Sequence, residues 1–286
     1  MKSLFRALIL LILFAPIFAG ASEKNTSTFS ETLQKAEQGD AKAQLELGYM
    51  YADGDGVEQD NHEAFKWFLK SAEQGYPQAQ YVIGYAYDAG GVVEKDIGEA
   101  LKWYRKAAEQ GRAEAQYTLG NRYANGQDVE QDFKEAFTWL SKAAEQGHTQ
   151  AQFYIGTMYT EGQSVEKNDS EGIKWLLKAA EKGHADAQYN LGHTYFCCAG
   201  SEQSPEEALK WYRKAAEQGH VHAQYNLGFI LCGGWKVKQD YEECIKWLTK
   251  AAEQGSEEAQ SYLEVAIPDE ELEKYRKKSE ADQESK

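Results

Sequence analysis

Four cysteines are the side chains best able to do covalent chemistry in this chain of 286 residues, and all four lie in its last third. They are Cys197, Cys198, Cys232 and Cys244. Four cysteines allow three disulfide pairings, and an oxidising compartment lets such bonds persist. Cys232 and Cys244 are predicted near the end of one helix and the start of its antiparallel neighbour, which favours a bond between them. Cys197 and Cys198 then form a vicinal bond or stay free, or one of the two reaches Cys232 instead.

A zinc site is the other chemistry that these cysteines permit, with His193 joining Cys197, Cys198 and Cys232 as a ligand. The chain has no C-x-x-C pair, and export favours oxidation of thiols over metal binding. We therefore predict no metal and no cofactor.

Three histidines recur every 36 residues, at His148, His184 and His220. Stacked helix pairs would hold them roughly 10 Å apart, which is too far for shared metal coordination. We expect them beside the C-terminal ends of helices, where the partial negative charge of the helix favours a protonated imidazole.

Familiar catalytic motifs are incomplete or missing. The segment 53–56 (DGDG) starts like a calcium loop but lacks the terminal bidentate glutamate, so we interpret it as a helix-ending turn. His62-Glu63 lacks the second histidine of a zinc-protease helix. We find no nucleophile elbow, phosphate loop or dinucleotide fingerprint, so the sequence predicts a protein that is not an enzyme.

The chain is strongly acidic, with a formal net charge of −15 at pH 7. Such a surface repels phosphate backbones and anionic lipids, which argues against nucleic acid as a partner. A protein or peptide partner that is attracted electrostatically should be basic. The alternative interpretation is that the charge only keeps an elongated protein soluble.

The first residues have the pattern of a secretory signal peptide. Lys2 and Arg6 precede an apolar run at 7–18, and Ala19-Gly20-Ala21 offers a cleavage site after Ala21. The alternative is an uncleaved anchor, but the run of about a dozen residues is shorter than the roughly 20 that a spanning helix needs. We expect export without stable membrane insertion, to the periplasm or to the outside of the cell.

The rest of the chain is organised by an internal repeat of 36 residues. The segment KAAEQG at 106–111 recurs with small changes up to Gly255, and a glycine and a tryptophan keep the same spacing. The tryptophans are Trp67, Trp103, Trp139, Trp175, Trp211 and Trp247. A fixed period of this length is typical of stacked helical repeats.

Each repeat predicts two short helices, which we call helix A and helix B. In the third repeat Ala115, Leu119 and Tyr123 share a helical face, and Gly126 ends helix A. Asp132 with a glutamate three residues later forms a capping box that starts helix B. The equivalent pairs are Asp60/Glu63, Asp96/Glu99, Asn168/Glu171, Ser204/Glu207 and Asp240/Glu243.

The predicted fold is therefore all-α, an αα solenoid whose short helices are stable because neighbouring repeats stack. The predicted repeats are 40–75, 76–111, 112–147, 148–183, 184–219 and 220–255. Residues 22–39 form a loose linker and a capping helix from Ser30, and 256–286 form a C-terminal cap and charged tail.

The repeat resembles the Sel-one-like repeat family, relatives of the tetratricopeptide repeat. The resemblance rests on A-x-A-Q-Y-x-L-G-x-x-Y in helix A, G-x-G-V-x-x-D in the turn, and E-A-x-x-W-Y-x-K-A-A-E-Q-G in helix B, from Asp40 to Gly255. It implies a right-handed superhelix that serves as an interaction scaffold. The fifth repeat departs from the pattern at FCCAGSEQSPEEA, where Cys198 takes the usual glycine position, and the sixth has GGWKVKQD.

Positions that differ between repeats should carry specificity, since positions that repeat build the stack. They form a stripe along helix A, which the resemblance places on the concave side. Exposed aromatic and polar members would bind a protein. The candidates are Tyr49, Tyr85, Asn121, Tyr154, Asn190, His193, Asn226 and Phe229. The alternative is that variation marks unconstrained surface.

Trp235 is a further candidate because it lies in the irregular turn of the sixth repeat. Either it is an exposed binding residue or, as we favour, it folds back over the neighbouring helix. The functional prediction is an exported, non-catalytic scaffold with a role in envelope regulation or host interaction. The alternative is an envelope enzyme or a β-lactam- or peptidoglycan-binding protein, as the resemblance to cysteine-rich relatives implies.

Overall fold

The computed structural model describes residues 24–197 and 204–284, so the predicted signal peptide lies outside the described residues. Fifteen helices and no strand occur in these two ranges, which confirms the all-α prediction. The chain divides into two compact units, one ending at Gln110 and the other beginning at Gly111. No described helix combines the length and the apolar character needed to cross a bilayer.

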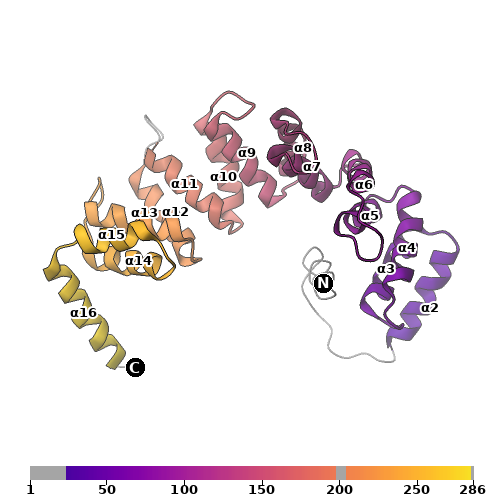
Figure 1. Ribbon diagram of the computed structural model, residues 1–286, viewed down its shortest axis with the longest axis horizontal. Coiled ribbons are helices and arrows are strands. Elements are labelled where there is room, and N and C mark those ends of the chain that lie inside the picture. Colours follow the sequence, from indigo (N-terminus) through magenta and orange to yellow (C-terminus); the bar gives the residue numbers. More distant parts are fainter. Residues whose placement is uncertain (1–23, 198–203, 285–286) are drawn as a thin grey trace. The chain divides into compact units, whose positions relative to one another are not determined.

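The described residues of the first unit, 24–110, form five helices, and consecutive helices pack side by side (Figure 1). They are α2 (Lys24–Glu37), α3 (Ala41–Asp53), α4 (Asn61–Glu73), α5 (Pro77–Ala89) and α6 (Ile97–Glu109). We predicted a loose segment before Ser30, but helix α2 already begins at Lys24. The prediction is therefore wrong for residues 24–29. The reason is Phe29, whose ring meets Tyr51 at 5.7 Å and packs against the core around Leu47.

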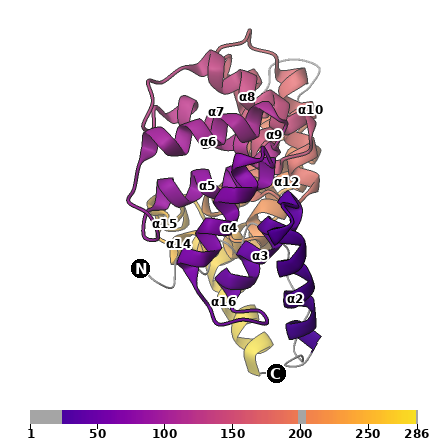
Figure 2. The ribbon, with the colours of Figure 1, turned by 90° about the vertical axis from the view of Figure 1, so that its right-hand side faces the viewer.

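The second unit continues the same alternation of helix A and helix B (Figure 2). Its helices are α7 (Ala113–Asn125), α8 (Phe133–Glu145), α9 (Thr149–Glu161), α10 (Asp169–Glu181), α11 (Ala185–Cys197), α12 (Pro205–Glu217), α13 (Val221–Gly233), α14 (Tyr241–Glu253), α15 (Glu257–Val265) and α16 (Asp269–Glu284). Helix α15 is the predicted half repeat. The charged helix α16 packs on α14, where Lys278 pairs with Glu242 at 2.6 Å.

The predicted caps of helix B are present, although only one half of each capping box forms as expected. Asp132 accepts hydrogen bonds from the backbone N–H groups of Lys134 and Glu135, at 2.8 and 3.0 Å. In four repeats the glutamate that should return to the cap instead pairs with a lysine three residues later, as Glu171 does with Lys174 at 2.6 Å. The N-cap side chain therefore sets where helix B begins.

The repeated glycine of helix A lets helix B approach closely. A Cβ atom added to Gly120 would lie 2.6 Å from Cγ of Leu140, and one added to Gly84 would lie 2.7 Å from the ring of Tyr104. Real Cβ atoms do not come so close, so only glycine fits at this crossing. The helices of one repeat consequently pack around buried side chains such as Leu119 and Leu140.

Buried glutamines join the two helices of a repeat, and several also donate to the repeat before, as Nε2 of Gln188 does to the carbonyl of Ala180 at 3.0 Å. Gln116 accepts a hydrogen bond from Nε2 of Gln146 at 2.7 Å, and Gln188 accepts one from Gln218 at the same distance. In the fourth repeat Lys182 occupies the donor position, and Oε1 of Gln152 is buried without a hydrogen-bond partner. The repeated Ala-Gln pair is thus part of the joint between repeats.

Candidate protein-binding surface

The predicted stripe, which we call the helix-A face, lies on α3 and α5 in the first unit and on α7, α9, α11 and α13 in the second. Most of its candidate residues are half-buried rather than exposed, and only His193 and Trp235 are exposed. The expectation of exposed tyrosines is therefore wrong. Helical periodicity gives the direction of a side chain, whereas its depth depends on the size of its neighbours.

In the first unit the two candidates, Tyr49 and Tyr85, are both half-buried. The ring of Tyr49 meets Phe68 of helix B edge to face, with centroids 5.0 Å apart. Burial raises the pKa of the Tyr85 hydroxyl, and the nearby carboxylate of Asp88 raises it further. Both tyrosines therefore contribute to the packing of the repeat as well as to its surface.

In the second unit, polar candidates link neighbouring helices. Asn121 donates a hydrogen bond from Nδ2 to the hydroxyl of Tyr154 at 3.0 Å. Asn190 donates to Oγ1 of Thr157 at 3.5 Å, and Asn226 donates to the hydroxyl of Tyr212 at 3.4 Å. These amides lie along one face and hold it together across the repeats.

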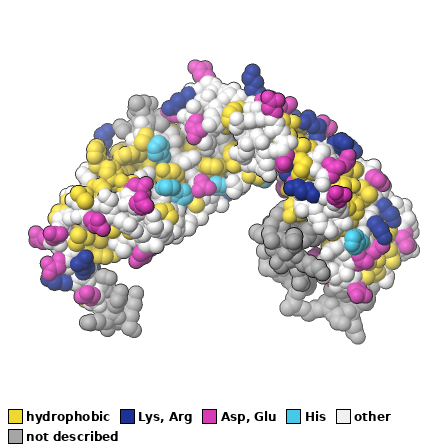
Figure 3. Space-filling model, in the orientation of Figure 1, with side chains coloured by type: hydrophobic (Ala, Val, Ile, Leu, Met, Phe, Trp, Pro, Cys, Tyr) yellow, Lys and Arg dark blue, Asp and Glu magenta, His cyan; other side chains and the backbone are white. Residues whose placement is uncertain are grey.

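An aromatic cluster occupies the end of the helix-A face at α13 and α15. The ring of Phe229 lies 6.2 Å from Trp235, 5.4 Å from Tyr262 and 6.1 Å from Tyr225. Trp235 folds back onto Phe229, as we favoured, yet 56% of its surface remains exposed. Figure 3 shows hydrophobic side chains gathered over this end of the second unit. Trp235 is thus folded back over the neighbouring helix and is also exposed, so the two interpretations of this residue are compatible.

Two residues of α15 extend this surface beyond the predicted set. Tyr262 stands 36 residues after Asn226, and Val265 stands 36 residues after Phe229. Val265 is 83% exposed, more than any other large hydrophobic residue in the described ranges. Continuing the repeat register into the C-terminal cap would have identified both residues.

The sixth repeat carries the favoured disulfide. Cys232 and Cys244 are joined with their Cα atoms 5.5 Å apart. These positions are equivalent to Ala52 and Ala64 of the first repeat. The bond thus replaces an ordinary contact between small residues of helix A and helix B.

Cys197 is an exposed free thiol, and Cys198 lies outside the described residues. Burial raises the pKa of the Cys197 thiol, and its Sγ lies 3.4 Å from Nε2 of His193. Within residues 24–197 and 204–284, no three histidine, cysteine or carboxylate side chains converge to hold a metal ion.

The recurring histidines follow the ends of helix B as predicted, but the expectation that they are protonated there is wrong. Nδ1 accepts a hydrogen bond from a backbone N–H at the start of helix A, at 3.3 Å for His148, 3.2 Å for His184 and 3.1 Å for His220. Burial lowers the pKa of each imidazole. Each ring also stacks on an aromatic ring of the preceding repeat, as His148 does on Tyr117 at 4.5 Å. They are neutral helix caps that join repeats.

The helix-A face is predominantly acidic. The same stripe of variable helix-A positions also carries exposed charged residues, which are Glu46, Asp53, Glu161 and Asp186 against the single lysine Lys42. The formal net charge of −15 is thus reflected in this surface, which favours contact with positive groups.

Comparison with known families and structures supports the repeat assignment. The family model described as "Sel1 repeat" matches six times, at residues 41–76, 77–111, 113–148, 149–184, 185–220 and 221–256. Comparison with curated proteins gives no significant match.

Two solved structures are similar over most of their length. A Sel1 repeat protein from Oxalobacter formigenes is 34% identical with a TM-score of 0.66, and the match covers 80% of this chain and 92% of that one. The protein c5321, described as a protective antigen present in uropathogenic Escherichia coli strains and displaying an SLR fold, is 32% identical with a TM-score of 0.54. That match covers 86% of this chain and 69% of c5321.

Proposed function

This chain belongs to the Sel1 repeat family, and we propose that it is an exported, non-catalytic scaffold that binds a protein partner through its helix-A face. Sel1 repeats generally mediate protein–protein interactions. The observation that carries the proposal for this surface is the aromatic cluster at Phe229, where Trp235 remains exposed. Aromatic side chains at the edge of a packed cluster are the usual anchors of a protein interface.

Charge and the N-terminal sequence support the finer parts of the proposal. Because acidic residues predominate on the helix-A face, the partner should present basic residues to it. The pattern of Lys2, Arg6 and the apolar run at 7–18 supports export. The similar protein c5321 is described as a protective antigen, which agrees with a place accessible from outside the cell.

Capture of the partner from an envelope extract tests this function. The bait is the chain from Ser22 onward, and the matched variant is Trp235→Gln, because the equivalent turns carry Gln127 and Gln163. We expect the wild-type chain to retain a specific protein and W235Q to retain at least about fivefold less of it, since a central aromatic residue contributes about 1 kcal/mol or more. Phe133→Gln on α8 is the control, because Phe133 is 37% exposed away from the helix-A face.

Two results would contradict the proposal. One is equal retention of the partner by wild type and W235Q while F133Q weakens it. The other is hydrolysis of nitrocefin by the purified chain that a single substitution abolishes, because this would establish the enzymatic alternative.

A further inference from the structure

Trp235 packs on a glycine that only the sixth repeat has at its position. A Cβ atom added to Gly233, near the end of α13, would collide with Nε1 of the indole, so no other residue lets the ring lie there. The indole also stacks on Phe229, with ring centroids 6.2 Å apart. The other five repeats carry a side chain at the position of Gly233, namely Asp53, Ala89, Asn125, Glu161 and Cys197.

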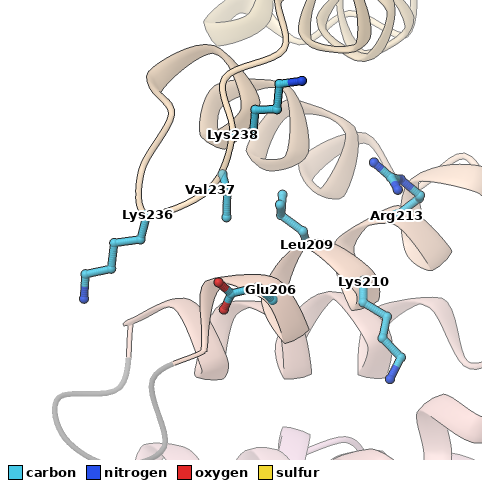
Figure 4. Close-up of a pocket in the computed structure, with 7 residues that line it drawn as sticks. All are labelled: Glu206, Leu209, Lys210, Arg213, Lys236, Val237 and Lys238. Carbon is cyan, nitrogen blue, oxygen red and sulfur yellow. The ribbon is translucent and has the colours of Figure 1, made fainter.

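The turn 234–240, which carries Trp235, is held against α12 and α13. Val237 lies beside Leu209 of α12 (Figure 4), and both side chains pack against the core of the last repeats. Nε2 of Gln239 donates a hydrogen bond to the carbonyl of Cys232 in α13 at 2.6 Å. The indole is thus held in place before a partner arrives, so binding to it costs little conformational entropy.

Trp235 differs from the six repeated tryptophans in the absence of a cation over its ring. Each repeated tryptophan lies under the lysine that follows three residues later in the same helix, at 3.6 to 4.8 Å from the ring centroid. Within the part of the chain that the structure describes, no lysine or arginine lies over Trp235, and 56% of its surface is exposed. Because tryptophan is the aromatic residue that attracts cations best, this ring can take a cation from a partner.

Carboxylates predominate on the α15 side of the aromatic cluster. Glu258 and Glu264 are exposed on α15, which contains no lysine or arginine. Glu258 lies four residues before Tyr262, and therefore on the same face of the helix as this member of the cluster. The lysines of the turn, Lys236 and Lys238, line the groove toward α12 instead (Figure 4). The charge beside the cluster on α15 therefore favours a cation.

We propose that Trp235 binds an arginine side chain of the partner protein, which stacks on the exposed part of the indole while the carboxylates of α15 attract its charge. The inference rests on the proposed function, because it names the group that the partner brings to the helix-A face. Charge complementarity selects a cationic side chain over an acidic or a neutral one. Among cations, arginine fits best because its planar guanidinium stacks on aromatic rings.

Nuclear magnetic resonance of the indole N–H groups tests this site. The protein is the chain from Ser22 onward with nitrogen-15 in its tryptophans, and Trp235→Gln identifies the signal of Trp235. The probe is the peptide acetyl-Gly-Arg-Gly-amide. The comparison peptide has citrulline in place of arginine, because citrulline has nearly the same shape without the charge.

A glycine variant tests whether the position of the indole matters. Gly233→Ala adds the Cβ atom that would collide with the ring, and it should fold normally because the second repeat has Ala89 there. The matched control is Gly98→Ala, which changes an exposed glycine of α6.

We expect the arginine peptide to shift the Trp235 signal in a saturable way and the citrulline peptide to bind at least about threefold more weakly, as loss of one exposed cation–π contact predicts. G233A should weaken binding of the arginine peptide by a similar factor, and G98A should leave it unchanged. No shift of the Trp235 signal, equal binding of the two peptides, or wild-type binding by G233A would overturn the proposal.

Failure of this inference is distinguishable from failure of the proposed function. Capture of a partner that depends on Trp235, together with equal binding of the two peptides, would retain the proposed function and refute the arginine site. Arginine-specific binding at Trp235 in a chain that captures no partner would support the site and refute the proposed function.

Discussion

Lys182 replaces the glutamine that neighbouring repeats use to complete a buried hydrogen-bond network. Its Nζ donates to the carbonyl of Gly147 at 2.6 Å, which leaves Oε1 of Gln152 without a partner. A buried acceptor without a hydrogen bond costs about 1–3 kcal/mol. We predict that Lys182→Gln restores the contact seen between Gln146 and Gln116 and raises the free energy of unfolding by about 1 kcal/mol.

Urea denaturation of K182Q and wild type measures this difference. Lys134→Gln, on the exposed surface of α8, is the control for loss of a positive charge and should leave the stability nearly unchanged. A K182Q protein that is no more stable than wild type would show that the missing hydrogen bond has no thermodynamic cost.

At the scale of single residues, the sequence predicted roles better than environments. The spacing of 36 identified the Gln and His rows, but Nδ1 capping by His148 requires the backbone geometry of the turn. The depth of Tyr49 depends on its contact with Phe68, which follows from how closely Gly48 lets helix B approach. Such contacts are decided by packing between helices, which periodicity does not describe.

The disulfide of the sixth repeat lies at an ordinary contact between helix A and helix B. Closing a short loop between Cys232 and Cys244 should stabilise the repeat by about 2–3 kcal/mol. We predict that a reductant lowers the midpoint of thermal unfolding of the wild type. Cys232→Ala with Cys244→Ala recreates the pair Ala52–Ala64, so this variant should unfold at the lower temperature with or without reductant. The prediction would be contradicted if the reductant opened the disulfide, as alkylation of the freed thiols would report, and yet left the unfolding midpoint of the wild type unchanged.

The histidine caps make the joints between helices dependent on pH. Burial lowers the pKa of His148, His184 and His220 in the folded chain below the unfolded value of about 6.5. The carboxylates of Glu114 and Asp186 raise these pKa values, but by less than burial lowers them. Lys182 near His148 and His222 near His220 lower the pKa further. A lowered pKa means that the unfolded chain binds more protons. The stability is therefore fully present above pH 6.5 and is lost as the pH falls through the folded pKa values.

We predict a lower free energy of unfolding at pH 5.5 than at pH 7.5, measured with urea. Replacement of the three histidines by serine, the cap that Ser256 provides for α15, should reduce this difference because serine accepts a hydrogen bond at both pH values. An equally large difference in the serine variant would assign the pH effect to other groups.

At the scale of helices, the sequence was sufficient to place nearly every element. Caps such as Asp132 and terminal glycines such as Gly126 fix where the helices begin and end, because each satisfies backbone groups that the helix leaves unpaired. The start of α2 was missed because it depends on the contact of Phe29 with Tyr51, which the repeat pattern does not include.

For the whole molecule, the repeat separates two tasks. Glycines, alanines and buried glutamines are the same in most repeats because they build the stack, whereas the helix-A face and the turn 234–240 differ from repeat to repeat. Membership of the Sel1 repeat family indicates a scaffold for protein binding. Specificity for one partner must then come from the positions that vary, of which His193, Trp235 and Val265 are exposed.

The most direct test of this account is the dissociation constant of the captured partner for two triple variants, measured by isothermal titration calorimetry. The first changes exposed residues of the helix-A face, as His193→Ala, Trp235→Gln and Val265→Ala, and the second changes exposed residues of helix B, as Glu109→Ala, Glu145→Ala and Glu181→Ala. We predict at least about a hundredfold weaker binding for the first, or about 2.7 kcal/mol, and less than about threefold for the second. Weaker binding by the helix-B variant with wild-type affinity in the helix-A variant would contradict the account.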